Sequence, residues 1–530
     1  MTWDYIVVGA GSAGCVVGAR LSEESRRRVL VLEAGGSDRS LAVSMPAAGF
    51  LLALANPRYD WAYRAEPDPT RGGRRDYMPR GKVLGGTSAI NGMSYVRGQP
   101  EDYDAWAALG CRGWDFESVL GYFRRAEDNE NGADAYHGTG GPLPVANART
   151  RHPLSQAYLE ACVATGLDRV ADINAPPQAG VGYVPVTQRR GRRYSAARAY
   201  LRPAMGRASL RVLSHAHVRR VLFDGRRAVG VEYDRRGRTE RAEAARGVVV
   251  SAGAFASPQL LMLSGVGPAA HLGALGIPVV HDLPGVGENL QDHPGLAQTC
   301  WARGTTYNMQ TGPLNALRFG AQWLFCGTGP GATPHSQVTA FTRHDGAAGR
   351  SDIQYLFSPA GFDLSEEGPV LFDRPAVTGL INVLRPFSRG RVRLASADPF
   401  AQPAIQPNLF ADERDLDLLL AGAKLQRRIF ETAPLARAIT GHHRPGEDVQ
   451  SEDEWRAYLR ESAMSAYHPA GTCRMGHDRM AVVDERLRVR GLANLHVADA
   501  SIMPAIVSGN LHATCVMIGE KAADLIRAGA

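Results

Sequence analysis

One histidine, His468, stands out by its surroundings. It lies in the segment AYHPAGTCRMG (residues 466–476), directly before Pro469 and a glycine turn. A histidine in this setting could be a buried structural residue, a metal ligand or a general base. Its unperturbed pKa lies near working pH, so a neutral imidazole there can accept a proton from a substrate. The elements that position this histidine should show which of these three roles it has.

The N-terminal segment carries a dinucleotide-binding pattern. A predicted strand at residues 5–8 leads into a glycine-rich turn and a helix from about Ser12 to Leu21, and a second strand, Val29–Leu32, ends at Glu33. The glycines of this G-x-G-x-x-G motif are Gly9, Gly11 and Gly14. They permit a tight turn, a close approach to a pyrophosphate and helix–strand packing, while the acid accepts from ribose hydroxyls. The complete pattern predicts bound NAD or FAD, and Glu33 disfavours the 2′-phosphate of NADP.

Segments far along the chain are predicted to return to the same parallel sheet. An apolar strand at residues 247–250 is followed by a helix, which we expect Ser257 to cap and Pro258 to begin. A second apolar strand at residues 495–498 ends at Asp499, at the edge where open α/β sheets bind ligands. The nucleotide-binding domain is therefore expected to draw on the start, the middle and the end of the chain.

The sequence pattern changes at residues 301–465, where short strands separated by turn residues and a long helix at residues 412–430 are predicted. We interpret this stretch as a sheet-plus-helix domain over the substrate, with Tyr355, Phe357 and Phe362 as candidates for the pocket wall. The expected fold class is α/β, a Rossmann-like domain joined to an α+β substrate-binding domain. The predicted division assigns residues 1–150, 151–300 and 466–530 to the first, middle and last parts of the nucleotide-binding domain, and residues 301–465 to the substrate-binding domain.

The composition is that of a globular protein with a basic balance. Lys and Arg number 60 against 53 Asp and Glu, which gives a net charge of +7. Arginines gather at residues 71–75, 189–193 and 235–238. Such clusters could bind nucleic acid or an anionic membrane surface. Because no aromatic residues are interleaved to stack on bases and acidic residues nearly balance the charge, we interpret them instead as solvated loops and hairpin turns.

Metal, disulfide and membrane functions find little support in the sequence. The seven cysteines are scattered without a Cys-x-x-Cys pair, which argues against a disulfide framework or a zinc site. His215 and His217 lie two apart on a predicted strand, and we interpret them as solvent-facing. No apolar run approaches the roughly 20 residues of a membrane span, and the N-terminus shows no leader. We expect a cytoplasmic protein with no metal, membrane span or nucleic-acid partner.

Five further motifs carry a family resemblance. RGKVLGGTSAINGMSYVRG (residues 80–98) is followed in order by GAFASPQLLMLSGVG, NLQDHP, RPFSRGRVRL and YHPAGTCRMG. Together with the N-terminal pattern, the set resembles the glucose–methanol–choline (GMC) oxidoreductases, and most of all their choline-dehydrogenase-like and furfuryl-alcohol-oxidase-like branch. The resemblance implies FAD rather than NAD. It implies oxidation of an alcohol, expected to be primary, to an aldehyde or ketone, with electrons passed to a quinone-like acceptor or O₂.

The resemblance also implies roles for particular residues. His468 would stand before flavin N5 and take the hydroxyl proton while the flavin takes the hydride, and Asn510 would orient the alcohol oxygen. His512 would be either a second acid/base group or a hydrogen-bond partner of the flavin or its neighbour. The implied cofactor-binding residues are Gly9, Gly11, Ser12, Ala13, Gly14, Glu33, Ala34, Arg80, Val83, Thr87, Asn91, Gly92, Met93, Ser94, Val218, Tyr467, Asp499 and Ala500.

The chain departs from some relatives at Ile90, where they carry the histidine that attaches FAD covalently, so we expect non-covalent FAD. Two other functions occur, or are conceivable, on such a fold: a lyase or light-driven decarboxylase, and a flavin-binding protein without catalysis. The presence of both His468 and Asn510 argues against the last of these.

Overall fold

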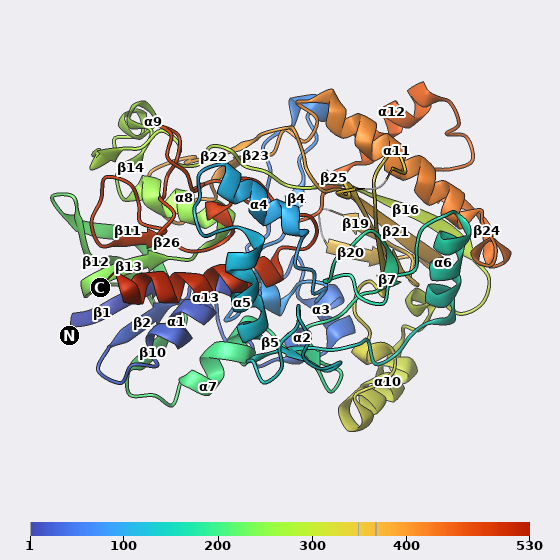
Figure 1. Cartoon of the computed structure of the whole chain (residues 1–530), viewed down its shortest axis with the longest axis horizontal. Coiled ribbons are helices and arrows are strands. Elements are labelled where there is room, and N and C mark those ends of the chain that lie inside the picture. The colour runs from blue at the N-terminus through green and yellow to red at the C-terminus, as the bar shows by residue number, and fades with distance from the viewer. Residues whose placement is uncertain (1, 348, 366–367, 530) are drawn as a thin grey trace.

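The computed structural model describes residues 2–347, 349–365 and 368–529. Two large sheets lie at opposite ends of the long axis, and both termini lie at the end formed by the first sheet (Figure 1). Among the described residues, no helix combines the length and the apolar character needed to cross a bilayer.

The first sheet is built as the dinucleotide pattern predicts. Its strands follow the order β10-β2-β1-β13-β12-β11, and β26 pairs with β13. Five strands, β10, β2, β1, β13 and β26, pair in parallel, whereas β12 and β11 continue the sheet in antiparallel pairing. The central segments, residues 5–8, 29–32 and 248–250, are apolar and buried. The strands are β1 (Thr2–Val8), β2 (Val29–Leu32), β10 (Leu210–Leu213), β11 (Ala216–Asp224), β12 (Arg227–Arg235), β13 (Arg238–Val250) and β26 (Leu495–Val497).

Two helices from opposite ends of the chain pack together beside this sheet. Helix α1 (Ser12–Leu21) follows the glycine turn as predicted, and helix α13 (His512–Ala528) lies against it. Gly14 permits close packing beneath α1, because a Cβ added there would lie 2.0 Å from the carbonyl oxygen of Gly9. The first and last parts of the predicted nucleotide-binding domain therefore meet in space (Figure 1).

The helix after β13 begins earlier than predicted. Helix α8 spans Gly253–Leu263, so Pro258 lies inside it and Ser257 does not precede it. Pro258 cannot donate to the carbonyl of Ala254, but the hydroxyl of Thr472 donates to that oxygen at 2.6 Å. The Ser257 hydroxyl caps the helix from within by accepting from the Ala252 N–H at 3.1 Å. A distant residue thus compensates for the proline, which local sequence rules cannot anticipate.

The second sheet has the order β24-β16-β21-β18-β17-β7, and β25 pairs with β16. Helices α11 (Glu413–Phe430) and α6 (Pro153–Ala164) pack on one face, and Asp412 caps α11 through the Arg414 N–H. The strands are β7 (Gly180–Tyr183), β16 (Pro294–Ala302), β17 (Val338–Thr342), β18 (Ile353–Ser358), β21 (Ala376–Val383), β24 (Ile439–Arg444) and β25 (Met464–Ser465). Since β7, α6 and part of β16 precede residue 301, this layer takes in more chain than residues 301–465, and the domain division stays a prediction.

Candidate active site

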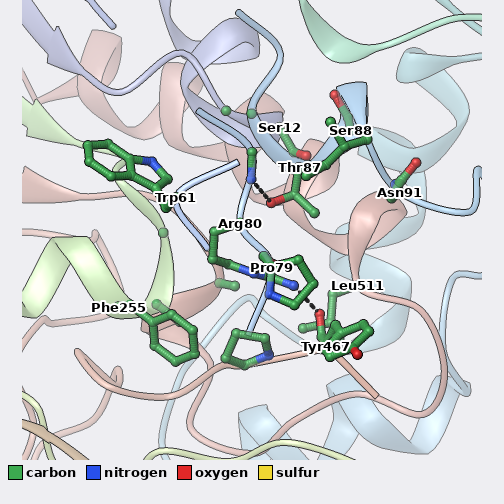
Figure 2. Close-up of a pocket in the computed structure, with 18 of the residues that line it drawn as sticks. Ser12, Trp61, Pro79, Arg80, Thr87, Ser88, Asn91, Phe255, Tyr467 and Leu511 are labelled. Carbon is green, nitrogen blue, oxygen red and sulfur yellow. Dashed lines mark hydrogen bonds between the residues drawn. The ribbon is translucent and has the colours of Figure 1, made fainter. Parts of the chain in front are cut away.

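A cavity lies between the two sheets. One end is formed by the glycine turn with Glu33, and the other by Leu296 and Leu356 of the second sheet. His468 and Asn510, from separate C-terminal loops, line this second end. The loop after β4 (Tyr77–Met78) forms a further wall, with Arg80, Thr87 and Asn91 around it (Figure 2).

Most of the residues singled out in the sequence meet at this cavity. His468, Asn510 and His512 line it, together with Gly9, Gly11, Ser12, Ala13, Glu33, Ala34, Arg80, Thr87, Asn91, Gly92, Met93, Ser94, Val218, Tyr467, Asp499 and Ala500. Gly14 and Val83 are instead buried in the packing around the cavity.

The residues present fit a dinucleotide cofactor. The first turn of α1 points at the cavity. Its N-cap residue, Gly11, has no side chain to bond the free N–H groups, and the turn, in the described chain, contains no acidic residue. These N–H groups therefore suit a pyrophosphate. The backbone is packed closely, because a Cβ on Gly86 would lie 2.7 Å from the Cα of Gly11. Nε2 of His512 is a buried polar atom on the lining with no hydrogen-bond partner among the described residues.

Glu33 sits where a ribose acceptor is needed. Its carboxylate accepts from the Ala10 N–H at 2.8 Å and from the Gly35 N–H at 2.7 Å. Burial raises its pKa to about 7, although these two hydrogen bonds and the charge of Lys82 oppose the rise. The carboxylate therefore both holds the glycine turn and faces the cavity.

Asp499, at the carboxyl end of β26, organises the neighbouring turns. Oδ2 accepts from the Gly253 N–H at 2.8 Å and from the Ser257 hydroxyl at 2.5 Å, while Oδ1 accepts from the Ser501 N–H. These contacts hold the start of α8 against the loop that follows β26. The position at the strand end is as predicted.

Arg80 brings a partly buried positive charge to the loop of His468. Its guanidinium donates to the carbonyl of Tyr467 at 2.5 Å, a contact visible in Figure 2. Tyr467 has a φ of 65°, in the left-handed region, so the chain turns sharply just before His468. Asp292 holds the other side of this turn by accepting from the His468 N–H at 2.9 Å.

The imidazole of His468 is held between two polar side chains. Nδ1 lies 3.0 Å from Nδ1 of His293, and Nε2 lies 3.0 Å from Nδ2 of Asn510. Asn510 itself is oriented by Gln354, which donates to its Oδ1 at 3.3 Å, and Gln354 accepts from Asn382 at 3.2 Å.

These contacts run in one direction. An amide nitrogen can only donate, so Nε2 of His468 must accept from Asn510 and its proton must lie on Nδ1. Nδ1 then donates to His293, which must accept and carry its own proton on Nε2. The unprotonated nitrogen of His468 is therefore Nε2, which faces Asn510. Both side chains line the cavity.

The electrostatic surroundings keep His468 neutral. Burial lowers its pKa well below the usual value, and the nearby His293 and Arg80 lower it further. The sequence suggests a base with a pKa near working pH, and the structure corrects this, because the imidazole lies in a buried site beside positive charge. His293 is also neutral, since burial lowers its pKa to about 3 while the carbonyls of Val507 and Leu384 oppose the fall.

His512 faces a different partner. Its Nδ1 lies 2.9 Å from the hydroxyl of Ser12 in the glycine turn. Burial lowers its pKa to about 4, and the charge of Arg193 lowers it further. Arg193 is itself buried and donates to the carbonyl of Asn91 at 2.6 Å, on the loop that lines the cavity.

Several site residues are not singled out by the sequence reasoning. His293 and Asp292 lie in the motif NLQDHP, and the adjacent acid and histidine were the available signal. Gln354 and Asn382 were detectable only as polar residues within apolar strands. Arg71 and Arg193 lie in basic clusters interpreted as solvated, yet both side chains are buried, so that interpretation is wrong for these two residues.

Two interpretations of aromatic and histidine side chains also need correction. Tyr355 and Phe357 alternate with Gln354 and Leu356 along β18, so they point into the core away from the cavity. Phe357 stacks on Tyr158 at 4.3 Å there.

Phe362 is buried against Phe50 and His335, behind the cavity wall that these two form. His217 is not solvent-facing, because it lines the cavity and packs edge-on against Trp61. Within the described part of the chain, no group of three or more potential ligands could hold a metal ion.

The chain is similar to known proteins over nearly its whole length. The family models for the N- and C-terminal parts of GMC oxidoreductases match residues 3–295 and 386–519. Human mitochondrial choline dehydrogenase is 45% identical over 535 residues, covering 99% of this chain and 90% of that protein. The oxygen-dependent choline dehydrogenase of Sinorhizobium fredii is 42% identical over 537 residues, covering 99% and 96%.

Solved structures extend the likeness to the fold. Pyridoxine 4-oxidase from Mesorbium loti has a TM-score of 0.89 at 34% identity and covers 99% of both chains. A fungal aryl-alcohol oxidase has a TM-score of 0.83 at 26% identity, covering 100% of this chain and 99% of the other. The chain therefore belongs to the GMC oxidoreductase family and is an FAD-dependent oxidoreductase that acts on alcohols.

Proposed function

We propose that His468 is the general base that takes the hydroxyl proton of a primary alcohol. The observation that carries this is the approach of its Nε2 lone pair to within 3.0 Å of the Asn510 amide on the cavity lining. A bound alcohol can replace this contact: its hydroxyl then donates to His468 Nε2, and its oxygen accepts from Asn510 Nδ2. When bound, FAD supplies the acceptor for the hydride that leaves the carbinol carbon.

The surrounding residues support this role. His293 holds the proton on His468 Nδ1, so Nε2 stays unprotonated and can take the alcohol proton once the alcohol displaces the Asn510 amide. Arg80, whose charge reaches His468, stabilises the negative charge that forms on the alcohol oxygen. His512 is proposed to be a hydrogen-bonding residue for the cofactor and its turn, because it is paired with Ser12.

We propose non-covalent FAD, since Ile90 has no nucleophilic atom with which to attach a flavin. The proposed cofactor contacts are the lining residues named above, with Glu33 at the ribose hydroxyls and the first turn of α1 at the pyrophosphate. Gly14 and Val83 are proposed to act through packing rather than through contact. The acceptor of the electrons is proposed to be a quinone-like compound or O₂, and the seven free thiols suit a cytoplasmic location.

The walls near His468 favour an uncharged substituent on the alcohol. Leu296, Leu356 and Leu380 supply apolar surface at this end of the cavity. Among the described lining residues, the carboxylates are Glu33 and Asp499, and both already accept hydrogen bonds from backbone N–H groups. A quaternary ammonium group would thus meet no free carboxylate on the described lining.

A matched pair of substrates tests this proposal. Choline and 3,3-dimethylbutan-1-ol have nearly the same shape and differ in the charge of the bulky end. We expect the neutral alcohol to bleach the flavin faster under anaerobic conditions and to have the higher kcat/KM. A higher kcat/KM for choline would overturn the substituent proposal. Bleaching by neither alcohol, nor by other primary alcohols, would count against alcohol oxidation at this site.

A further inference from the structure

Helix α10 (Pro313–Cys326) presents an apolar face to solvent. Leu314 is 84% exposed, Leu317 73% and Phe325 83%, and Leu324 is also exposed. Together with Ala321 these residues recur at helical spacing on one side of α10, whereas Trp323 on the opposite side is buried. We call Leu314, Leu317, Ala321, Leu324 and Phe325 the α10 face.

The helix is firmly held with this face outward. The Trp323 indole donates to the carbonyl of Gly191 at 2.8 Å, and the guanidinium of Arg192 lies 4.5 Å from the centre of the indole. The helix also packs on the short 3₁₀ helix η5 (Pro330–Ala332). In Figure 1 it stands out from the lower edge of the molecule. The exposure of the α10 face is therefore built into the fold.

Three chain segments at the α10 face carry arginines and no acidic residue. The sequence has no acidic residue from 293 to 344, from 39 to 59 or from 173 to 223. These three segments meet here, because Gly191 contacts Gly327 and η5 packs against both α10 and α3 (Pro46–Leu52). Arg318 on α10 and Arg190 beside its end are exposed.

We propose that the α10 face docks on the surface of an anionic membrane, with α10 lying in the plane of the interface. Leucine and phenylalanine on one side and arginine at the rim are the features of helices that bind in this way. The nearby Asp128 is paired with Arg189, so the exposed Arg190 and Arg318 remain to meet anionic headgroups.

The position of this surface relates it to the cavity. Helix α3 exposes Leu51 and Leu52 on one side and places Phe50 on the cavity lining on the other. If a bilayer contacted both α10 and α3, helix α3 would therefore separate the bilayer from the cavity. The proposal does not depend on which alcohol is oxidised.

Flotation of the FAD-loaded enzyme with vesicles tests the proposal. We expect it to float with phosphatidylcholine vesicles that contain phosphatidylglycerol, less with phosphatidylcholine alone, and less at high salt. Leu317→Glu with Phe325→Glu should lower the bound-to-free ratio at least about tenfold. Arg190→Ala with Arg318→Ala should weaken binding to the anionic vesicles selectively.

Matched controls carry the same changes elsewhere. Leu109→Glu with Val163→Glu alters other exposed apolar residues, and Arg236→Ala with Arg238→Ala alters a distant hairpin. All variants should keep the activity measured with a soluble acceptor. The proposal is overturned if the wild type floats with neither vesicle, or if the controls lose binding as the α10 variants do. It is also overturned if light scattering shows a wild-type oligomer that the α10 variants dissociate, since the face would then be a self-association surface.

Discussion

The side-chain amide of Asn510 lies 3.0 Å from Nε2 of His468 and donates to it. This contact determines which imidazole nitrogen can take a proton, because Nε2 must be unprotonated to accept. Asn510 is aimed by Gln354, on a strand of the second sheet, while His468 follows β25 of the same sheet. The second sheet therefore orients the base and its partner as well as covering the cavity.

Asn510 can be tested by two substitutions that differ in hydrogen-bonding character. Asn510→Ala removes a donor and should slow flavin reduction by about tenfold, in keeping with one lost hydrogen bond. Asn510→Asp presents an acceptor to Nε2, favours a proton there and should slow reduction further. Anaerobic stopped-flow reduction measures both. Equal rates for the two variants would show that the direction of this hydrogen bond is unimportant.

His293 should act by positioning the proton of His468. His293→Leu removes the acceptor for Nδ1–H and should lower the reduction rate about 5- to 30-fold, the range expected for one buried hydrogen bond. His293→Gln can still accept and should recover part of the rate. FAD content, read from the visible spectrum, should be unchanged in both. If the Gln and Leu variants are equally slow, the effect is one of packing.

Glu33 should make FAD binding depend on pH. Its pKa is raised to about 7, so the carboxylate is the dominant form only above that pH. An ionised carboxylate is the better acceptor for ribose hydroxyls, and the affinity of the apoenzyme for FAD should therefore rise as pH increases through about 7. Glu33→Gln should bind FAD about 10- to 100-fold more weakly, without this pH dependence. Fluorescence titration of the apoenzyme measures both, and a wild-type affinity that does not change with pH would contradict the assignment.

Much of this site follows from local sequence patterns. The turn at Gly9, strand β2 and helix α1 lie where the dinucleotide pattern predicts them, because each depends on neighbouring residues. His293 and Gln354 could not be placed in the same way, since they reach His468 and Asn510 only through pairings within the second sheet. The early start of α8 depends likewise on Thr472, far along the chain. Local sequence patterns predict individual helices, strands and turns, whereas contacts between distant elements can be identified only from the three-dimensional structure.

The attachment of FAD can be checked directly. With Ile90 at the position where some relatives carry the linking histidine, acid precipitation should leave the flavin in the supernatant. Flavin that stays in the washed pellet would contradict this prediction and would require a different attachment residue.

The central claim is that His468 is the base, and the rate of anaerobic flavin reduction as a function of pH tests it most directly. Because the pKa of His468 is lowered well below its usual value, the wild-type rate should be constant above about pH 6.5 and fall only at lower pH. His468→Ala should be at least about 100-fold slower, with normal FAD content and no such fall. His512→Ala should keep both the fall and most of the rate. A His468→Ala enzyme that retains the wild-type profile, or a His512→Ala enzyme that loses it, would contradict the account.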